Sequence, residues 1–131
     1  MVCIDTDFLV ALLRGDGEAA AAARELDQSR ARKSTTPINA FELLLGAHLS
    51  QQRERNLHLV RELLDSLTLL EFDLESCESA ASIFARLRST GDQIGIQDTM
   101  IAGIALRHKE ALLTRNTQHY RRVQDLMTRT W

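Results

Sequence analysis

Residues 98–114 read Asp-Thr-Met-Ile-Ala-Gly-Ile-Ala-Leu-Arg-His-Lys-Glu-Ala-Leu-Leu-Thr and contain the clearest pair of structural elements in the chain. The first part, up to residue 108, has the composition of a helix and is almost free of charge, so we expect a helix that is buried on most sides. The apolar run at residues 111–114 predicts a short buried strand. A buried helix that leads into a buried strand is typical of a parallel sheet covered by helices.

The rest of the chain shows the same alternation of strands and helices. Such alternation implies right-handed crossovers and an α/β fold, a three-layer α/β/α sandwich with a short central parallel sheet. The 131 residues suffice for a single domain, 1–131. Strands are expected at residues 1–4, 34–35, 68–72 and 111–114, and helices at 8–13, 18–30, 37–51, 53–66, 74–89 and 98–108, with a short helix near 117.

Composition narrows the class of protein. Apolar residues make up 44% and charged residues 26% of the chain, which is typical of a globular domain. The net charge of −2 argues against a polybasic nucleic-acid binder, although not against an enzyme that holds nucleic acid locally. The two cysteines, Cys3 and Cys77, match no metal-ligand spacing and favour a reducing compartment. With no apolar run of membrane-spanning length and no signal peptide, we expect a soluble cytoplasmic protein without membrane contact.

Polar residues follow two of the expected strands at the point where each strand ends. Asp5, Thr6 and Asp7 come after the first strand, and residues 114–116, Thr-Arg-Asn, end the strand that begins at residue 111. Ligands bind beyond the carboxyl ends of the strands in an open parallel sheet. These side chains are therefore the first candidates for a functional site.

Two further acids occur in apolar surroundings. Glu42 shares a helical stripe with Ile38, Leu45 and Leu49, and a carboxylate buried there must be paired, protonated or bound to a cation. Asp98 lies at the start of the nearly uncharged helix, at the mouth of a buried element.

Each of these residues also has a simpler interpretation. Asp5 and Asp98 suit helix N-caps, Glu42 could reach solvent at the edge of its helix, and Asn116 suits a turn.

Three carboxylates at one sheet edge would repel one another unless they shared a divalent cation. Oxygen ligands in that number suit Mg²⁺ or Mn²⁺, which could activate water for phosphodiester hydrolysis.

The motifs at residues 4–9 (Ile-Asp-Thr-Asp-Phe-Leu), 39–43 (Asn-Ala-Phe-Glu-Leu), 98–106, 113–116 (Leu-Thr-Arg-Asn) and 119–120 (His-Tyr) resemble a PIN domain over essentially the whole chain. More narrowly, they resemble the VapC-type toxins of toxin–antitoxin pairs. That resemblance implies a Mg²⁺-dependent endoribonuclease that acts on RNA, forms a homodimer and is silenced by a cognate antitoxin protein.

By position, the resemblance makes Asp5, Glu42 and Asp98 the metal-binding and catalytic carboxylates. Asn116 stands at a fourth catalytic position, where the family often has Asp. The resemblance therefore implies that one negative charge is missing there, which would weaken the binding of a second metal ion. Thr6 and Thr114 match hydroxyl residues around the site, where they would contact substrate and orient metal-bound water.

Basic residues near the predicted sheet edge are candidates for phosphate contacts. We expect Arg14 and Arg115 to bind the RNA substrate. The alternative is that both are ordinary surface charges in contact with solvent. The four histidines have no zinc-ligand spacing, and we interpret them as surface or packing residues. Surplus leucines in the two helices at 37–51 and 53–66 suggest an oligomer or partner surface.

Two other protein classes and a non-enzymatic function are alternatives. Asp5-Thr6-Asp7 also resembles the start of haloacid-dehalogenase-type phosphatases, and an acidic pair after a strand occurs in phospho-accepting receiver domains. Both need a suitably placed lysine late in the chain, where Lys109 is the only lysine and lies at the far end of a helix. A catalytically weakened PIN domain that serves as a nucleic-acid-binding or assembly module stays open because of Asn116.

Overall fold

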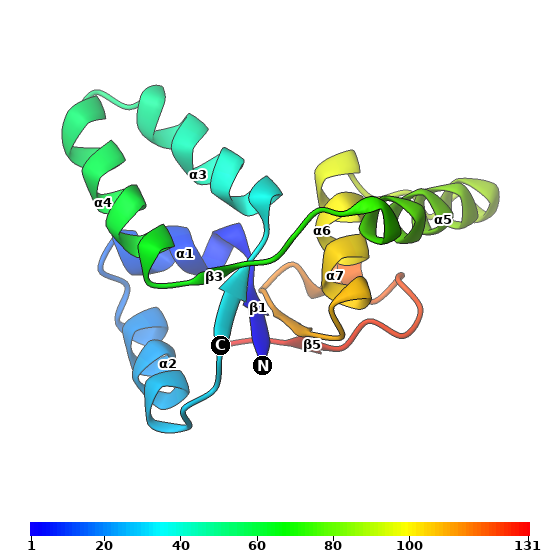
Figure 1. Cartoon of the computed structure of the whole chain (residues 1–131), viewed down its shortest axis with the longest axis horizontal. Helices are drawn as coiled ribbons and strands as arrows, with labels where there is room; N and C mark the ends of the chain where they lie inside the picture. The colour runs from blue at the N-terminus through cyan, green and yellow to red at the C-terminus, as the bar shows by residue number, and fades with distance from the viewer.

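A parallel sheet of five strands forms the centre of the computed structural model, which describes all of residues 1–131. The strands run in the order β3-β2-β1-β4-β5, and every neighbouring pair is parallel. Helices α1 to α4 lie on one side of the sheet and α5 to α7 on the other (Figure 1). The predicted α/β/α sandwich is therefore confirmed. The strands are β1 (Val2–Ile4), β2 (Lys33–Thr35), β3 (Thr68–Leu69), β4 (Ala111–Leu113) and β5 (Thr128–Arg129), and the helices are α1 (Thr6–Leu13), α2 (Gly17–Gln28), α3 (Pro37–His48), α4 (Arg53–Asp65), α5 (Leu74–Thr90), α6 (Ile96–Arg107) and α7 (Thr117–Tyr120).

The central strand β1 divides the interior into two cores. Val2 and Ile4 belong to the apolar cluster beneath α1 to α4, and Cys3 belongs to the cluster beneath α5 to α7. Successive side chains of a strand point to opposite faces, so a fully buried strand needs apolar residues at every position. All three residues of β1 are buried, as the continuous apolar run predicts.

Helix starts are defined by side-chain caps at most of the expected places. Asp5 caps α1, and Thr36 caps α3 in a reciprocal capping box with Asn39. Helix α6 differs, because its N-cap is Gly95, which has no side chain to offer. The simpler interpretation of Asp98 as a helix cap is therefore wrong: Asp98 lies inside the first turn of α6.

Several boundaries differ from the expected ones. Helix α3 ends at His48, three residues before the expected end, and β3 covers only Thr68–Leu69. Strand β5 was not expected at all, since Thr128 and Arg129 form no apolar run and only their pairing with β4 makes them a strand. None of the helices is long and apolar enough to cross a membrane.

Helices α5 and α6 approach each other closely at a glycine. A Cβ atom added to Gly103 would lie 2.7 Å from both the Cβ and the backbone nitrogen of Ala80, which is closer than real contacts allow. Gly103 is therefore required where α6, the helix that carries Asp98, packs on α5.

We expect Gly103→Ala to lower the free energy of unfolding by about 1–3 kcal/mol, because the methyl group can be accommodated only if the helix backbones separate. Gly46→Ala is the matched control, since Gly46 is also helical but has open space around its Cβ position. That substitution should raise stability by about 1 kcal/mol through helix propensity alone. Chemical denaturation of both variants measures the difference, and equal effects of the two substitutions would contradict the close packing.

Candidate active site

The parallel pairing of β1 and β4 builds the centre of the site. Ile4 is in register with Leu113, and the backbone N–H of Asp5 continues the ladder by donating to the carbonyl of Leu113 at 3.0 Å. Asp5 and Thr114 therefore leave the sheet side by side, and the Thr114 hydroxyl donates to Asp5 Oδ2 at 2.7 Å. Both side chains are buried. The predicted meeting of polar residues at the carboxyl ends of these strands is confirmed.

Asp5 is held from two further directions. The backbone N–H of Thr6 and the side-chain amide of Asn39 each donate to Asp5 Oδ1 at 2.9 Å. Burial raises the pKa of Asp5 to about 6 and the neighbouring Asp7 carboxylate adds to the rise, although the hydrogen bond from Thr114 opposes it. The fold thus holds this carboxylate in one orientation, and its burial makes the ionised form less stable relative to the protonated form.

Glu42 reaches the same region from α3. Thr6 Oγ1 donates to Glu42 Oε1 at 2.9 Å and accepts a hydrogen bond from the Asn39 amide, also at 2.9 Å. Because the Asn39 amide also donates to Asp5, two side chains, Asn39 and Thr6, link the first two acids. Asn39 is fully buried, and the sequence offered no sign of this role beyond its place in a motif.

The stripe around Glu42 is less buried than expected. Leu45 is 44% exposed and Leu49 is 77% exposed, while Ile38 alone packs partly against a core. The inference that Glu42 lies on a buried apolar face is therefore wrong. Glu42 itself is only partly buried, so its carboxylate remains partly accessible to solvent.

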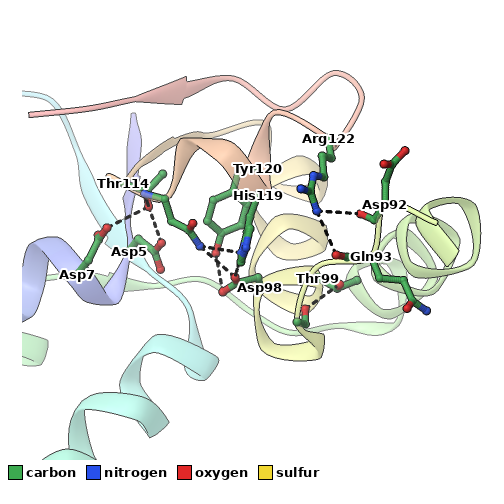
Figure 2. A network of polar contacts seen from close by, with 12 residues as sticks. Asp5, Asp7, Asp92, Gln93, Asp98, Thr99, Thr114, His119, Tyr120 and Arg122 are labelled. Carbon is green, nitrogen blue, oxygen red and sulfur yellow. Dashed lines mark hydrogen bonds and ion pairs between the residues drawn. The ribbon is translucent and has the colours of Figure 1, made fainter. Parts of the chain in front are cut away.

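Asp98 is held by residues of α7 and the loop before it. Tyr120 donates its hydroxyl to Asp98 Oδ1 at 3.2 Å, and Oδ2 is contacted by the Asn116 amide at 3.2 Å and by His119 Nδ1 at 3.1 Å. In Figure 2 the rings of His119 and Tyr120 both point toward Asp98. His119 is partly exposed, as expected for a surface residue, but its contact with Asp98 was not expected. Tyr120 is a second participant that the sequence reasoning missed.

Hydrogen bonds connect Asp98 to the rest of the site. The backbone N–H of Asn116 donates to Thr114 Oγ1 at 3.0 Å, so that Asp5, Thr114, Asn116 and Asp98 form one continuous chain of contacts. Burial and the negative charges of Asp5, Asp98 and Glu42 together raise the pKa of Tyr120 far above its ordinary value. The buried phenol thus lies within electrostatic range of all three carboxylates.

The donor chemistry of this region fits a hard divalent cation. Its side chains offer carboxylate, amide and hydroxyl oxygens, which Mg²⁺ and Mn²⁺ prefer. No three acidic, histidine or cysteine side chains lie close enough together to hold a metal ion in the arrangement seen. The carboxylates accept hydrogen bonds from protein donors instead, so an ion would have to draw the acids together and bind the lone pairs that these contacts leave free.

The two predicted arginines differ in their contacts. The guanidinium of Arg115 pairs with Glu18 at 2.6 Å and lies 4.2 Å from the centre of the Trp131 ring, while its backbone N–H donates to Asp7 at 2.8 Å. Arg115, in the loop after β4, therefore connects this loop with Glu18 of α2 and with Trp131. Arg14 is exposed at the end of α1, forms no ion pair, and lines hollows on both sides of that helix.

Asp5→Asn should remove a pH dependence of stability. The pKa of Asp5 is about 6 in the folded chain and near 3.8 when unfolded, so the folded state binds the proton more tightly. The wild-type free energy of unfolding should therefore fall between about pH 4 and pH 6, by up to ~3 kcal/mol, and the variant should lack this fall and be more stable at pH 7. Denaturation curves recorded with a chelator measure this difference, with the exposed Asp92→Asn as control. Parallel pH profiles for wild type and Asp5→Asn would contradict the burial of an ionised group.

Comparison with known proteins shows which family the chain belongs to. The model of the PIN domain family matches residues 2–126. A tRNA(fMet)-specific endonuclease VapC of Shigella flexneri is 27% identical over 128 residues, which cover 98% of this chain and 96% of the relative. A ribonuclease VapC of Haemophilus influenzae is 30% identical over 105 residues, which cover 80% of each protein.

A solved structure shows the same architecture. The crystal structure of DNA-bound VapBC from Salmonella typhimurium contains a chain that superimposes with a TM-score of 0.91 at 26% identity, covering 100% of this chain and 99% of the other. The match spans both layers of helices and the whole sheet, as well as the segments that carry Asp5, Glu42 and Asp98. The chain belongs to the PIN domain family and, within that family, to the VapC-type toxins.

Proposed function

We propose that residues 1–131 form a single nuclease domain, a Mg²⁺-dependent endoribonuclease toxin that hydrolyses phosphodiester bonds of RNA. The observation that carries the proposal is the hydrogen-bonded group of Asp5, Glu42 and Asp98 beyond the carboxyl ends of β1 and β4. The relatives named as ribonucleases support the same reaction. These three carboxylates would hold the ion, with Mn²⁺ as a substitute for Mg²⁺.

Each acid has a different task in this proposal. A bound Mg²⁺ supplies positive charge that lets a polyanion approach three carboxylates, and it favours ionisation of water. Asp5 is the fixed member, because Thr114, Thr6 and Asn39 all donate to it. Glu42 Oε2 accepts no hydrogen bond from the protein, so it is free to take the proton of the attacking water.

The hydroxyl and amide groups complete the site. Thr6 and Thr114 orient the carboxylates through their hydroxyl groups. Thr6 is only partly buried and would contact the substrate, whereas Thr114 is fully buried, so the expected substrate contact of Thr114 is wrong. Asn116 occupies the fourth position without charge, which favours the use of one metal ion rather than two. For the RNA backbone, Arg14 is the freer phosphate contact, whereas Arg115 must exchange its pairing with Glu18 for a phosphate.

A cognate antitoxin protein would regulate this activity. A groove of about 310 Å³ between α1, α3 and α4 is lined by apolar side chains such as Leu13, Leu43 and Leu59, and Glu42 stands at its edge. An antitoxin segment in this groove would cover Glu42, and the related Salmonella structure is a VapBC complex. We also propose a homodimer, because α3 exposes Phe41, Leu45 and Leu49.

The RNA substrate and the free thiols Cys3 and Cys77 favour a location in the cytoplasm.

A second candidate is a catalytically weakened PIN domain that binds nucleic acid or serves in assembly. The neutral Asn116, together with the absence of three acids close enough for a metal ion in the arrangement seen, is the observation in its favour. The two functions differ in their need for metal, since only the nuclease requires Mg²⁺ or Mn²⁺.

Asp98→Asn should abolish RNA cleavage and leave the fold intact. Loss of a metal ligand should exceed the ~10–100-fold typical of residues that merely support ligands. The matched control is Asp92→Asn, an exposed carboxylate in the loop before α6, which should cleave like wild type. Rates on one RNA with excess Mg²⁺ measure the effect. Cleavage by Asp98→Asn at the wild-type rate, or cleavage in excess chelator, would exclude the metal-dependent nuclease.

Asn116→Asp should shift cleavage to lower metal concentrations, because a carboxylate attracts a cation more strongly than an amide. Asn116→Ala should lower activity less than Asp98→Asn does. If Asn116 only forms the turn after β4, both substitutions will change stability alone. Cleavage rates against Mg²⁺ and Mn²⁺ concentration distinguish the two roles, and superimposable curves after correction for folded fraction would defeat a role in the site.

A further inference from the structure

We propose that Tyr120 is a positioning residue, whose hydroxyl fixes the orientation in which Asp98 meets the metal ion. The inference rests on the proposed function, because it takes Asp98 as a ligand of that ion. Neither the motifs nor the comparisons assign a task to this hydroxyl. The hydrogen-bond partners of the Asp98 carboxylate are unevenly distributed between its two oxygens.

The two oxygens of Asp98 are occupied to different degrees. Oδ2 accepts the Asn116 amide at 3.2 Å and lies 3.1 Å from His119 Nδ1, which donates to it in the tautomer that carries the proton on Nδ1. A carboxylate oxygen accepts about two hydrogen bonds. Oδ1 accepts only the Tyr120 hydroxyl, at 3.2 Å, which leaves it one free lone pair. The free lone pair of Oδ1 is thus the acceptor available to a cation without loss of an existing contact, and Tyr120 determines where it points.

The ring of Tyr120 is rigidly held. Its side chain is fully buried in the core that also contains Ile101, Ala105 and Val123. His119, by contrast, has 43% of its side chain exposed and can move away from Asp98 at little cost. The phenol is therefore the fixed partner of Asp98, as Asn39 is for Asp5.

The hydroxyl is also an uncharged donor. It donates to Asp98 Oδ1 from a ring that is fully buried in the core. A neutral donor can bind a carboxylate without competing as a cation for the charge that attracts the metal ion. A lysine or arginine in the same place would compete in that way.

Tyr120→Phe removes the oxygen atom and keeps the buried ring. Thr99→Val is the matched control, because Thr99 is the residue after Asp98 and its buried hydroxyl donates to the carbonyl of Gly95 rather than to an acid. Each variant loses one hydroxyl hydrogen bond near the start of α6. Thermal unfolding shows whether both remain folded.

We expect Tyr120→Phe to bind Mn²⁺ about 10–100-fold more weakly in calorimetry, and Thr99→Val to bind like wild type. In RNA cleavage at a fixed metal concentration, Tyr120→Phe should lower kcat and leave KM unchanged. A purely structural role would affect both variants alike. Equal Mn²⁺ affinity of Tyr120→Phe and wild type would overturn the inference.

A spectroscopic test needs neither RNA nor metal. Tyr120 is the only tyrosine in the chain, so its ultraviolet resonance Raman signal reports the hydrogen bond of this hydroxyl alone. The signal should change in Asp98→Asn, because an amide oxygen accepts a weaker hydrogen bond than a carboxylate. Identical spectra for wild type and Asp98→Asn would refute the contact. If the wild-type protein binds Mn²⁺ but cleaves no RNA, the proposed function fails, while the Mn²⁺ affinities and Raman spectra still decide the role of Tyr120. A wild-type protein that binds no Mn²⁺ would overturn both the proposed function and the role of Tyr120.

Discussion

The register of β1 against β4 is the constraint on which the site depends. Because Ile4 pairs with Leu113, Asp5 and Thr114 emerge together, and the Thr114 hydroxyl can join the first acid to the loop that contacts Asp98. A slip of one residue would reverse the faces of every β1 side chain, placing Cys3 in the wrong core and turning Asp5 away from Thr114. The two apolar cores that fix this register therefore also fix the polar site.

The acids come from different layers of the sandwich. Asp5 follows the central strand, Glu42 lies on a helix of the α1–α4 layer, and Asp98 lies on a helix of the α5–α7 layer. Each outer acid has its own support, Asn39 and Thr6 on one side and the α7 residues on the other. A bound cation would thus join the two layers beyond the sheet edge, where α3 and α6 are already in contact, which gives metal binding a direct effect on stability.

The alternation of apolar strands and helices was enough to predict the sandwich, and the strand ends were enough to locate Asp5 and Thr114. Strand β5 could not be predicted, because two polar residues carry no periodic pattern and depend on their partner strand. Asn39 and Tyr120 were missed for a related reason. Their contacts with Asp5 and Asp98 span 34 and 22 residues of sequence, and an asparagine in a first helical turn or a tyrosine in a core has an ordinary structural explanation.

The central claim is that Asp5, Glu42 and Asp98 together hold one divalent ion. Anomalous X-ray scattering from crystals of the active protein grown with Mn²⁺ tests it most directly, since the method locates the metal without assumptions about its ligands. The account predicts an anomalous peak bound by these three carboxylates, with Tyr120 still donating to Asp98. Mn²⁺ bound elsewhere, with no peak at the carboxylates, would contradict it.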